Sequence, residues 1–185
     1  MKERRRKRME RMLDNFIKEF SAHGVDKTTI KMLAKSVNCN EALLYQYFED
    51  KDDMIVQCTE YNYRKIVDRV VKLWAENVLD LEKTGEKTIK YLNSVMDQCG
   101  FLIQVMAHPT YSASLQAKRR YRSEQMQEFI DILQKVYVLS EDEALGITLG
   151  LNSFVYSYVL HPEKKWFFIQ YNTMVNFLQR RVEAA

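Results

Sequence analysis

The side chains best suited to recognition chemistry lie in one short stretch of the chain that is predicted to form a helix. Leu44 and Phe48 would face a core, so the outer face carries Glu41, Gln46 and Tyr47. A glutamine side chain can form two hydrogen bonds with the edge of an adenine. An aromatic side chain on a short helix is costly to expose without a ligand. The stretch therefore predicts a surface that binds a ligand.

Two further helices must position that stretch. Apolar residues recur at three- and four-residue steps from Met9 to Phe20, which is typical of an amphipathic helix, and Gly24 follows where that helix would end. A second short helix is expected over residues 30–37. Residues 38–40 (Asn-Cys-Asn) are expected to form the next turn, because asparagine tolerates the left-handed region and caps helices. Three helices with such a turn are the plan of a helix-turn-helix, whose third helix enters the major groove of DNA.

Motifs in this segment resemble those of the tetracycline-repressor (TetR) family. Residues 28–34 (TTIKMLA) resemble the family's "TT-hydrophobic-x-x-hydrophobic-A" opening. Residues 44–48 (LYQYF), followed by Lys51, resemble its "LYxYFxxK" signature, and Phe20 and Gly24 fit its "LFxxxG" end of helix 1. The resemblance covers residues 9–55, approximately. It implies an all-α fold of about nine helices, with a helix-turn-helix domain over residues 1–52 and a helical effector-binding and dimerisation domain over residues 53–185.

The resemblance also implies a role for individual residues. The side chains expected to hold DNA phosphates are Thr28, Thr29, Lys31, Tyr45 and Lys51. Those expected to lie at the bases are Glu41, Ala42, Leu43, Gln46 and Tyr47, and Asn40, the expected cap of the third helix, is also counted among the DNA-binding residues. Phosphate contacts set the register of a protein on DNA, whereas base contacts set the sequence.

Three departures from the family pattern leave the operator sequence unpredictable. The family usually has Gly-Val-Ser at the turn, where this chain has Asn-Cys-Asn, and often has Thr or Ser in place of Leu43. Glu49 stands where Pro is frequent. The basic segment Lys2–Arg8 is expected either to add salt-dependent affinity for DNA or to be a solvated terminus.

Composition favours helices and excludes several classes of protein. The 185 residues include five Gly and two Pro, too few for a turn-rich β fold. No stretch approaches the roughly 18–20 apolar residues of a membrane span, and no apolar segment of a secretory signal follows the basic N-terminus. The three cysteines lack metal-ligand spacing and suit the cytoplasm. The net charge is +3, and its positive excess lies in residues 1–48.

Other chemistry has little support. The three histidines are scattered near predicted helix ends, so no metal site is expected, and no cofactor is expected either. No Gly-rich phosphate loop, nucleophile elbow or zinc-protease motif is present, and the chain is not expected to be an enzyme. Cys58 and Cys99 are expected in the core. A second basic cluster, residues 118–122, is interpreted as the solvated start of a helix.

Long helices are expected after residue 50, over residues 54–81, 87–106, 117–138, 140–161 and 164–182. Gly24, Gly85, Pro109 and Pro162 are expected at helix junctions, and Ser140 and Glu143 have the spacing of a capping box. Gly146 and Gly150 lie inside a predicted helix, where each costs about 1 kcal/mol relative to alanine. A close neighbour is therefore expected there, either within the protomer, across a dimer or in a ligand.

A homodimer is expected, because one chain supplies one recognition helix and a pseudo-palindromic operator needs two, ~34 Å apart. The resemblance places the interface on the last two helices, at Leu151, Phe154, Val155, Tyr158, Phe167, Tyr171, Met174 and Leu178. The resemblance also implies that a small effector binds in the helical domain over residues 53–185 and that its binding releases the DNA. The candidate effector residues are Trp74, Tyr91, Phe101, Met106, Tyr111, Phe129, Asn152 and Tyr156. Their composition favours an apolar or cationic aromatic compound.

These observations together predict a sequence-specific transcriptional regulator, interpreted as a repressor that an effector releases from DNA. The alternative is a helical protein-interaction module that has lost specific DNA binding. Leu43 and the acidic residues around the third helix favour that alternative.

Overall fold

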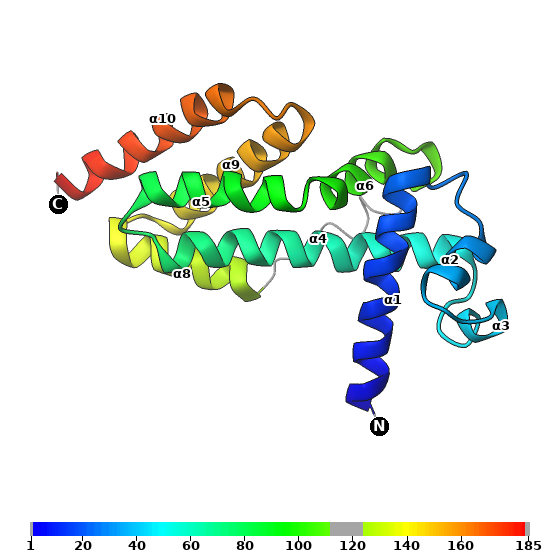
Figure 1. Ribbon diagram of the computed structural model, residues 1–185. Helices are drawn as coiled ribbons and strands as arrows, with labels where there is room; N and C mark the ends of the chain where they lie inside the picture. Colours follow the sequence, from blue (N-terminus) through cyan, green and yellow to red (C-terminus); the bar gives the residue numbers. More distant parts are fainter. Residues whose placement is uncertain (1, 112–123, 184–185) are drawn as a thin grey trace. The chain divides into compact units, whose positions relative to one another are not determined.

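The chain is helical throughout the part that the computed structural model describes, residues 2–111 and 124–183, and these residues contain no strand. In chain order the helices are α1 (Lys2–His23), α2 (Ile30–Ser36), α3 (Glu41–Leu44), α4 (Lys51–Glu76), α5 (Leu81–Ser94), α6 (Met96–Ala107), α8 (Glu124–Tyr137), α9 (Glu141–Leu160) and α10 (Lys164–Glu183) (Figure 1). The predicted all-α class is confirmed. None of these helices combines the length and the apolar character needed to cross a membrane.

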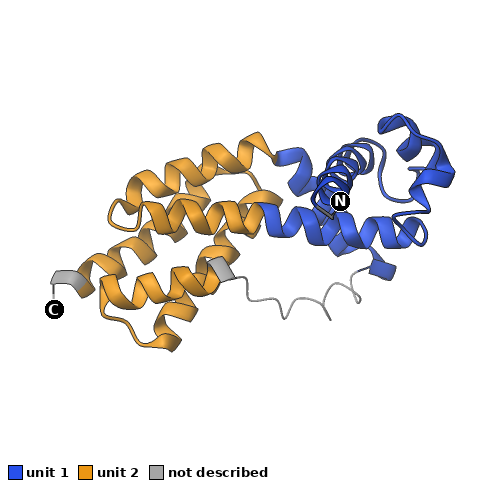
Figure 2. Ribbon diagram, turned by 90° about the horizontal axis from the view of Figure 1, so that it is seen from below, with its two compact units in different colours: residues 1–65, 96–120 blue, residues 66–95, 121–185 orange. Residues whose placement is uncertain are grey.

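The described residues form two compact units (Figure 2). Unit 1 contains residues 2–65 and 96–111, and unit 2 contains residues 66–95 and 124–183. The helix-turn-helix lies wholly in unit 1 together with α6, whereas α4 contributes residues to both units. The domain boundary predicted after residue 52 falls inside unit 1 and stays a prediction.

Unit 1 is built around the apolar face of α1. Phe16 and Phe20 are fully buried. The Phe16 ring centroid lies 5.6 Å from that of Phe48, and Phe20 stacks on Phe101 of α6 at 5.6 Å. Leu44 is buried in the same cluster. The prediction that Leu44 and Phe48 face a core is therefore confirmed, and α1 supplies that core.

Unit 2 is held together by buried aromatic side chains whose polar atoms find partners on neighbouring segments. The hydrogen bonds run from Trp74 Nε1 to Thr88 Oγ1 (2.8 Å), from Tyr137 Oη to Val78 O (2.5 Å), from Tyr158 Oη to Asn93 Oδ1 (2.8 Å) and from Tyr171 Oη to Leu81 O (2.6 Å). Burial raises the pKa of the Tyr137 and Tyr171 hydroxyls. Both hydroxyls therefore stay protonated and act as donors, which tie α8 to the turn before α5 and α10 to the first residue of α5.

Gly85 lies inside α5 and not at the predicted junction between two helices. The preceding helix already ends at Glu76, and Asp80 caps α5 by accepting the N–H of Lys83 at 3.2 Å. A Cβ at residue 85 would lie 2.7 Å from the Tyr171 ring. The glycine therefore allows α10 to approach α5 closely. From the sequence alone, a glycine with this packing role cannot be distinguished from a glycine that ends a helix.

One predicted helix, over residues 87–106, is divided in the structure between α5 and α6. Side chains from other helices bind the start of α6. Ser21 Oγ donates to Asp97 O at 2.9 Å. Asn62 Nδ2 donates to Gln98 O at 2.7 Å. These hydrogen bonds from α1 and α4 hold α6 in place. The apolar periodicity of the sequence does not predict them, because they are made by polar side chains from other helices.

The predicted ends of α9 are confirmed. Ser140 Oγ accepts the N–H of Glu143 at 3.2 Å, and the Glu143 carboxylate accepts the N–H of Ser140 at 2.9 Å, which completes the capping box. Pro162 stands two residues after the end of α9, and Pro109 stands two residues after the end of α6. The predicted start of the helix at residue 117 and the basic cluster over residues 118–122 lie outside the described residues.

Candidate nucleic-acid interface

The turn between α2 and α3 is held by hydrogen bonds of its own residues. Asn38 has a φ of 52°, in the left-handed region as predicted. The N–H of Cys39 donates to Ala34 O at 3.0 Å, which is the long hydrogen bond of a Schellman motif. Asn40 Oδ1 then accepts the N–H of Leu43 at 2.9 Å and caps α3. Three residues thus end one helix and begin the next.

α3 is only four residues long, and its outer face is largely polar. The exposed side chains in and after α3 are Glu41, Ala42, Tyr45 and Gln46. Leu43 and Tyr47 are half-buried. A helix this short has too few internal hydrogen bonds to be stable alone. Its orientation therefore depends on contacts with the rest of unit 1.

The threonines predicted to hold phosphates differ in what they do. Thr28 is fully buried and its hydroxyl donates to Gly24 O at 2.8 Å, so this side chain is not available to a phosphate. This corrects the prediction, because the motif position marks a packed loop and not a surface. Thr29 is exposed, and its Oγ1 caps α2 by accepting the N–H of Met32 at 3.3 Å. Lys31 is exposed on α2.

Lys51 belongs to a cluster that braces the helix-turn-helix. Its Nζ donates to Asp26 O at 3.1 Å. The Asp26 carboxylate lies 3.2 Å from Nε2 of His108, whose ring centroid is 4.6 Å from that of Tyr111. Tyr111 Oη donates to Asp52 Oδ1 at 2.6 Å, and burial together with Asp52 raises the pKa of Tyr111. The segment after α6 is thus tied to the loop before α2 and to the start of α4.

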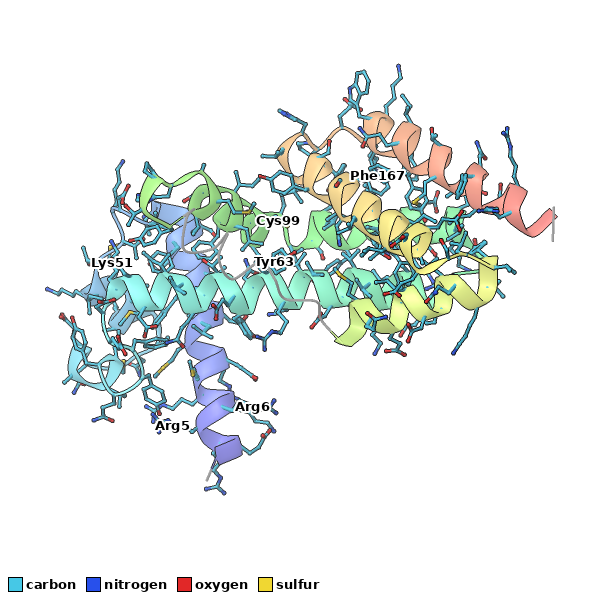
Figure 3. The ribbon with its side chains drawn as sticks, turned by 180° about the vertical axis from the view of Figure 1, so that it is seen from behind. Arg5, Arg6, Lys51, Tyr63, Cys99 and Phe167 are labelled. Carbon is cyan, nitrogen blue, oxygen red and sulfur yellow. The ribbon has the colours of Figure 1, made fainter. Side chains whose placement is uncertain are left out.

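α1 contributes two arginines that the sequence did not single out as a pair. The Cζ atoms of Arg5 and Arg8 lie 5.3 Å and 5.9 Å from the centroid of the Tyr47 ring. Arg5 Nη2 also donates to Gln46 O at 3.3 Å. Arg5 and Arg6 project from different sides of α1 (Figure 3). The available signal was the three-residue spacing, which places Arg5 and Arg8 on one face of a helix.

The neighbouring cations of α1 are paired within α1 itself. Arg6 Nη2 lies 3.0 Å from Glu3 Oε1, and Lys7 Nζ lies 3.6 Å from the same oxygen. Arg6 Nε lies 4.0 Å from Glu10 Oε1. The hydrogen bond and the charge of Arg6 lower the pKa of Glu3. Carboxylates therefore offset the charge on this side of α1, and the face toward α3 keeps its positive charge.

The predicted effector residues are divided between the two units. Unit 1 contains Phe101, Met106 and Tyr111, and unit 2 contains Trp74, Tyr91, Phe129, Asn152 and Tyr156. Trp74 and Phe129 are buried with their ring centroids 5.8 Å apart, which is a core contact. Tyr91 and Asn152 are half-buried, and Tyr156 is exposed. Apolar residue type alone does not separate a core aromatic from a pocket aromatic.

The buried amide of Asn62 in α4 was not predicted from the sequence. Asn62 is fully buried, and its Nδ2 donates to Gln98 O at 2.7 Å. Its Oδ1 has no hydrogen-bond partner within the described part of the chain. A buried polar atom without a partner costs about 1–3 kcal/mol. A ligand that donates a hydrogen bond to this oxygen would recover that cost. The available signal was an asparagine on the buried face of a long helix.

Most residues predicted for the dimer interface are used inside the single chain. The buried ones are Leu151, Tyr158, Phe167, Tyr171 and Leu178, and the half-buried ones are Phe154, Val155 and Met174. This corrects the prediction for the five buried residues, because they have no surface to offer a second copy. The large apolar side chains exposed on the same helices are Leu149, Tyr156, Leu160, Trp166, Ile169 and Phe177. A Cβ at Gly146 would meet nothing within 4 Å, so its expected neighbour is absent from the described part of the chain.

Comparison with known proteins identifies the segment that contains the helix-turn-helix. The family model described as "Bacterial regulatory proteins, tetR family" matches residues 13–58. A curated relative is the biofilm operon icaADBC HTH-type negative transcriptional regulator IcaR of Staphylococcus epidermidis, which is 29% identical over 68 residues. The match spans 37% of this chain and 37% of that relative.

Solved structures extend the similarity of fold to nearly the whole chain. A TetR family transcription regulator from Marinobacter aquaeolei has a TM-score of 0.64 at 16% identity, covering 94% of this chain and 96% of that one. The TetR family transcriptional regulator PfmR from Thermus thermophilus has a TM-score of 0.57 at 16% identity, covering 91% and 97%. The similarity to the tetR family of bacterial regulatory proteins thus lies in residues 13–58, and the solved structures show a shared fold over most of the chain.

Proposed function

We propose that the chain is a sequence-specific DNA-binding transcriptional repressor. The observation that carries this proposal is the α2–turn–α3 geometry, in which α3 buries Leu44 and turns polar side chains outward beside the cations of α1. In a helix-turn-helix the second of these helices lies in the major groove, and cations around it contact phosphates. The description of the IcaR relative as a negative regulator supports repression.

Selection of binding sites from random duplex DNA tests this function. We expect an enriched pseudo-palindrome whose half-sites are about one helical turn apart. Replacing Gln46 by Ala should relax the preference at one position of each half-site, whereas replacing Lys31 by Ala should weaken binding to all sequences. Lys31 is the better phosphate probe than Lys51, which binds Asp26 O. No enriched sequence between about 50 and 200 mM salt would contradict the proposal and favour the protein-interaction module.

The proposed repressor is a homodimer whose second copy covers the exposed apolar face of α9 and α10. Leu149, Tyr156 and Leu160 lie on one side of α9 at helical spacing, and Trp166 and Ile169 lie one turn apart on α10. Trp166 is 62% exposed, which is unusual for a tryptophan without a partner. A second copy suits this face, because a pseudo-palindromic operator needs two recognition helices and this chain supplies one.

The proposed signal for release of DNA is a small effector that binds the helical body. Asn62 supports this, because its buried Oδ1 accepts no hydrogen bond in the described structure. A thermal-shift screen of apolar and cationic aromatic compounds that carry a hydrogen-bond donor is the test. We expect the Asn62→Leu variant to lose the shift that a hit produces. A screen without hits would contradict an effector of this chemistry. A shift kept by the Asn62→Leu variant would contradict the role of Asn62.

A further inference from the structure

The first two turns of α1 have no core to cover, and yet they contact the recognition element. α1 begins at Lys2, whereas its apolar face first packs against the core at Met9. In the preceding turns, Arg5 and Arg8 lie over the Tyr47 ring, 5.3 Å and 5.9 Å from its centroid. Among the described residues, neither arginine forms an ion pair with a carboxylate. Their contacts therefore run to the segment that follows α3.

Tyr47 lies between this pair of cations and the core of unit 1. Its ring packs against the core cluster, with its centroid 6.4 Å from that of Phe48. Both guanidinium groups lie within the roughly 6 Å of the ring centroid that a cation–π contact needs. A guanidinium over an aromatic ring is attracted by the negative charge of the ring face, and it keeps its planar N–H donors available at the edge. The Tyr47 side chain is thus held by both the core and α1.

Arg5 also acts on the backbone. Its Nη2 donates to Gln46 O at 3.3 Å, at the end of a helix that has only four residues. Because α3 cannot hold its own conformation, the carbonyl contact and the ring contact restrain the position of Gln46 and Tyr47 together. Both of these residues are expected at the bases of the operator.

Resting on the proposed function, we propose that Arg5 and Arg8 are specificity-determining positioning residues. They hold Gln46 and Tyr47 in the orientation in which the end of α3 meets the bases. α1 thereby sharpens the preference for the operator bases that Gln46 and Tyr47 meet, without itself reading a base. A different role, plain attraction of Arg5 and Arg8 to DNA phosphates, would change affinity but not sequence preference.

The chain offers a matched control for this proposal. The Arg5→Gln/Arg8→Gln double variant removes two positive charges from the face toward α3. The Arg6→Gln/Lys7→Gln double variant removes two positive charges from the same turns, but from side chains that pair with Glu3 and not with Tyr47. Thermal unfolding of both variants shows whether α1 and unit 1 stay folded.

Operator selection is the deciding measurement, with binding to the selected site followed from about 50 to 200 mM salt. We expect the Arg5→Gln/Arg8→Gln variant to lose about two- to fivefold of its discrimination at the positions that Gln46→Ala and Tyr47→Ala also relax. The control variant should keep the wild-type motif. An unchanged motif in both variants, with equally weakened binding to all sequences, would overturn the proposal. Failure of the wild-type chain to select any sequence would instead contradict the proposed function.

Conservative variants keep the proposal testable if the glutamine variant unfolds. Arg5→Lys/Arg8→Lys keeps the charge but loses the planar stacking group, so we expect a relaxed motif with an unchanged salt slope. Tyr47→Phe keeps the ring on which the arginines lie, so adding Arg5→Gln/Arg8→Gln to it should still relax the motif. In the Tyr47→Ala background the same arginine substitutions should further relax only the positions that Gln46 reads, because the contact of Arg5 with Gln46 O is still lost. A lysine variant with the full wild-type motif would show that charge alone matters and would overturn the proposal.

Discussion

Unit 1 and unit 2 each expose a surface suited to a partner, and the two surfaces are chemically opposite. The outer face of α3 carries polar side chains beside arginines of α1. The outer faces of α9 and α10 carry Leu149, Tyr156, Trp166 and Ile169. The first suits a hydrated polyanion and the second suits an apolar surface that excludes water. DNA recognition and self-association are therefore placed on different units of the chain in the proposed function.

The two units also differ in how well single residues suit their backbone. Asn38 in unit 1 and Val138 in unit 2 both have a φ of 52° at the end of a helix. Asparagine tolerates this left-handed conformation, whereas a β-branched side chain is strained in it. The turn before α3 is thus built from well-suited residues, and the turn before α9 is not.

The largest effect is expected at the apolar surface of unit 2. The Trp166→Glu/Ile169→Glu variant should be monomeric, because burying two carboxylates in an apolar interface costs several kcal/mol. Its affinity for a pseudo-palindromic operator should fall by at least about 100-fold, since only one half-site is held at a time. Sedimentation velocity at micromolar concentration and operator binding at fixed salt measure both effects.

Leu79→Glu is the control for that variant. Leu79 is 84% exposed in the turn before α5, outside the proposed interface, so the same kind of substitution should leave the dimer intact. A dimer that survives with full operator affinity in the Trp166→Glu/Ile169→Glu variant would remove the proposed division between the two surfaces.

The next largest effect is expected on the free energy of unfolding, when Gly85 and Gly146 are each replaced by alanine. Gly85→Ala should lower the free energy of unfolding by about 1–3 kcal/mol, because the Cβ would lie 2.7 Å from the buried Tyr171 ring. Gly146→Ala in the monomeric variant should raise it by up to about 1 kcal/mol, because the site is open and alanine favours a helix. Urea denaturation measures both. Equal effects at the two sites would show that close packing of α10 on α5 does not require glycine.

The two residues with a left-handed backbone, Asn38 and Val138, also test the difference between the units. Val138→Gly should raise the free energy of unfolding by about 1 kcal/mol, because Val138 is 70% exposed and loses backbone strain without losing packing. Asn38→Gly should change it by less, since asparagine already tolerates this conformation. Denaturation at one protein concentration checks both variants, and a destabilised Val138→Gly variant would contradict the assignment of strain.

The smallest effect is a pH dependence at the start of α9. Hydrogen bonds from Ser140 and the charge of Arg181 lower the pKa of Glu143 from its ordinary 4.5. The stability that this carboxylate contributes is therefore present above pH 4.5 and is lost as the pH falls through the lowered folded-state pKa. The difference in stability between the wild-type chain and Glu143→Gln should shrink over that range. The N-cap of α3 is Asn40, which does not titrate, so Asn40→Ala should show a difference from wild type that does not follow this titration.

Residue types and spacing alone determined the helix-turn-helix. The interval between α2 and α3, the left-handed Asn38 and the cap at Asn40 are local properties, because each depends on hydrogen bonds within a few residues. The burial of Leu44 and Phe48 followed from a single apolar face on a short helix. Local chemistry of this kind also predicted the capping box of α9.

Tertiary structure alone decided which side chains remain available. α9 is apolar on most of its sides, so periodicity could not show whether Leu151 or Leu149 would be buried. Thr28 and Thr29 are adjacent and identical in type, but only packing decides that Thr28 is buried. The contact of Arg5 with Gln46 spans 41 residues. Exposure and long-range contacts depend on how helices pack against one another, and a linear pattern of residue types carries that information only where a helix has one apolar face.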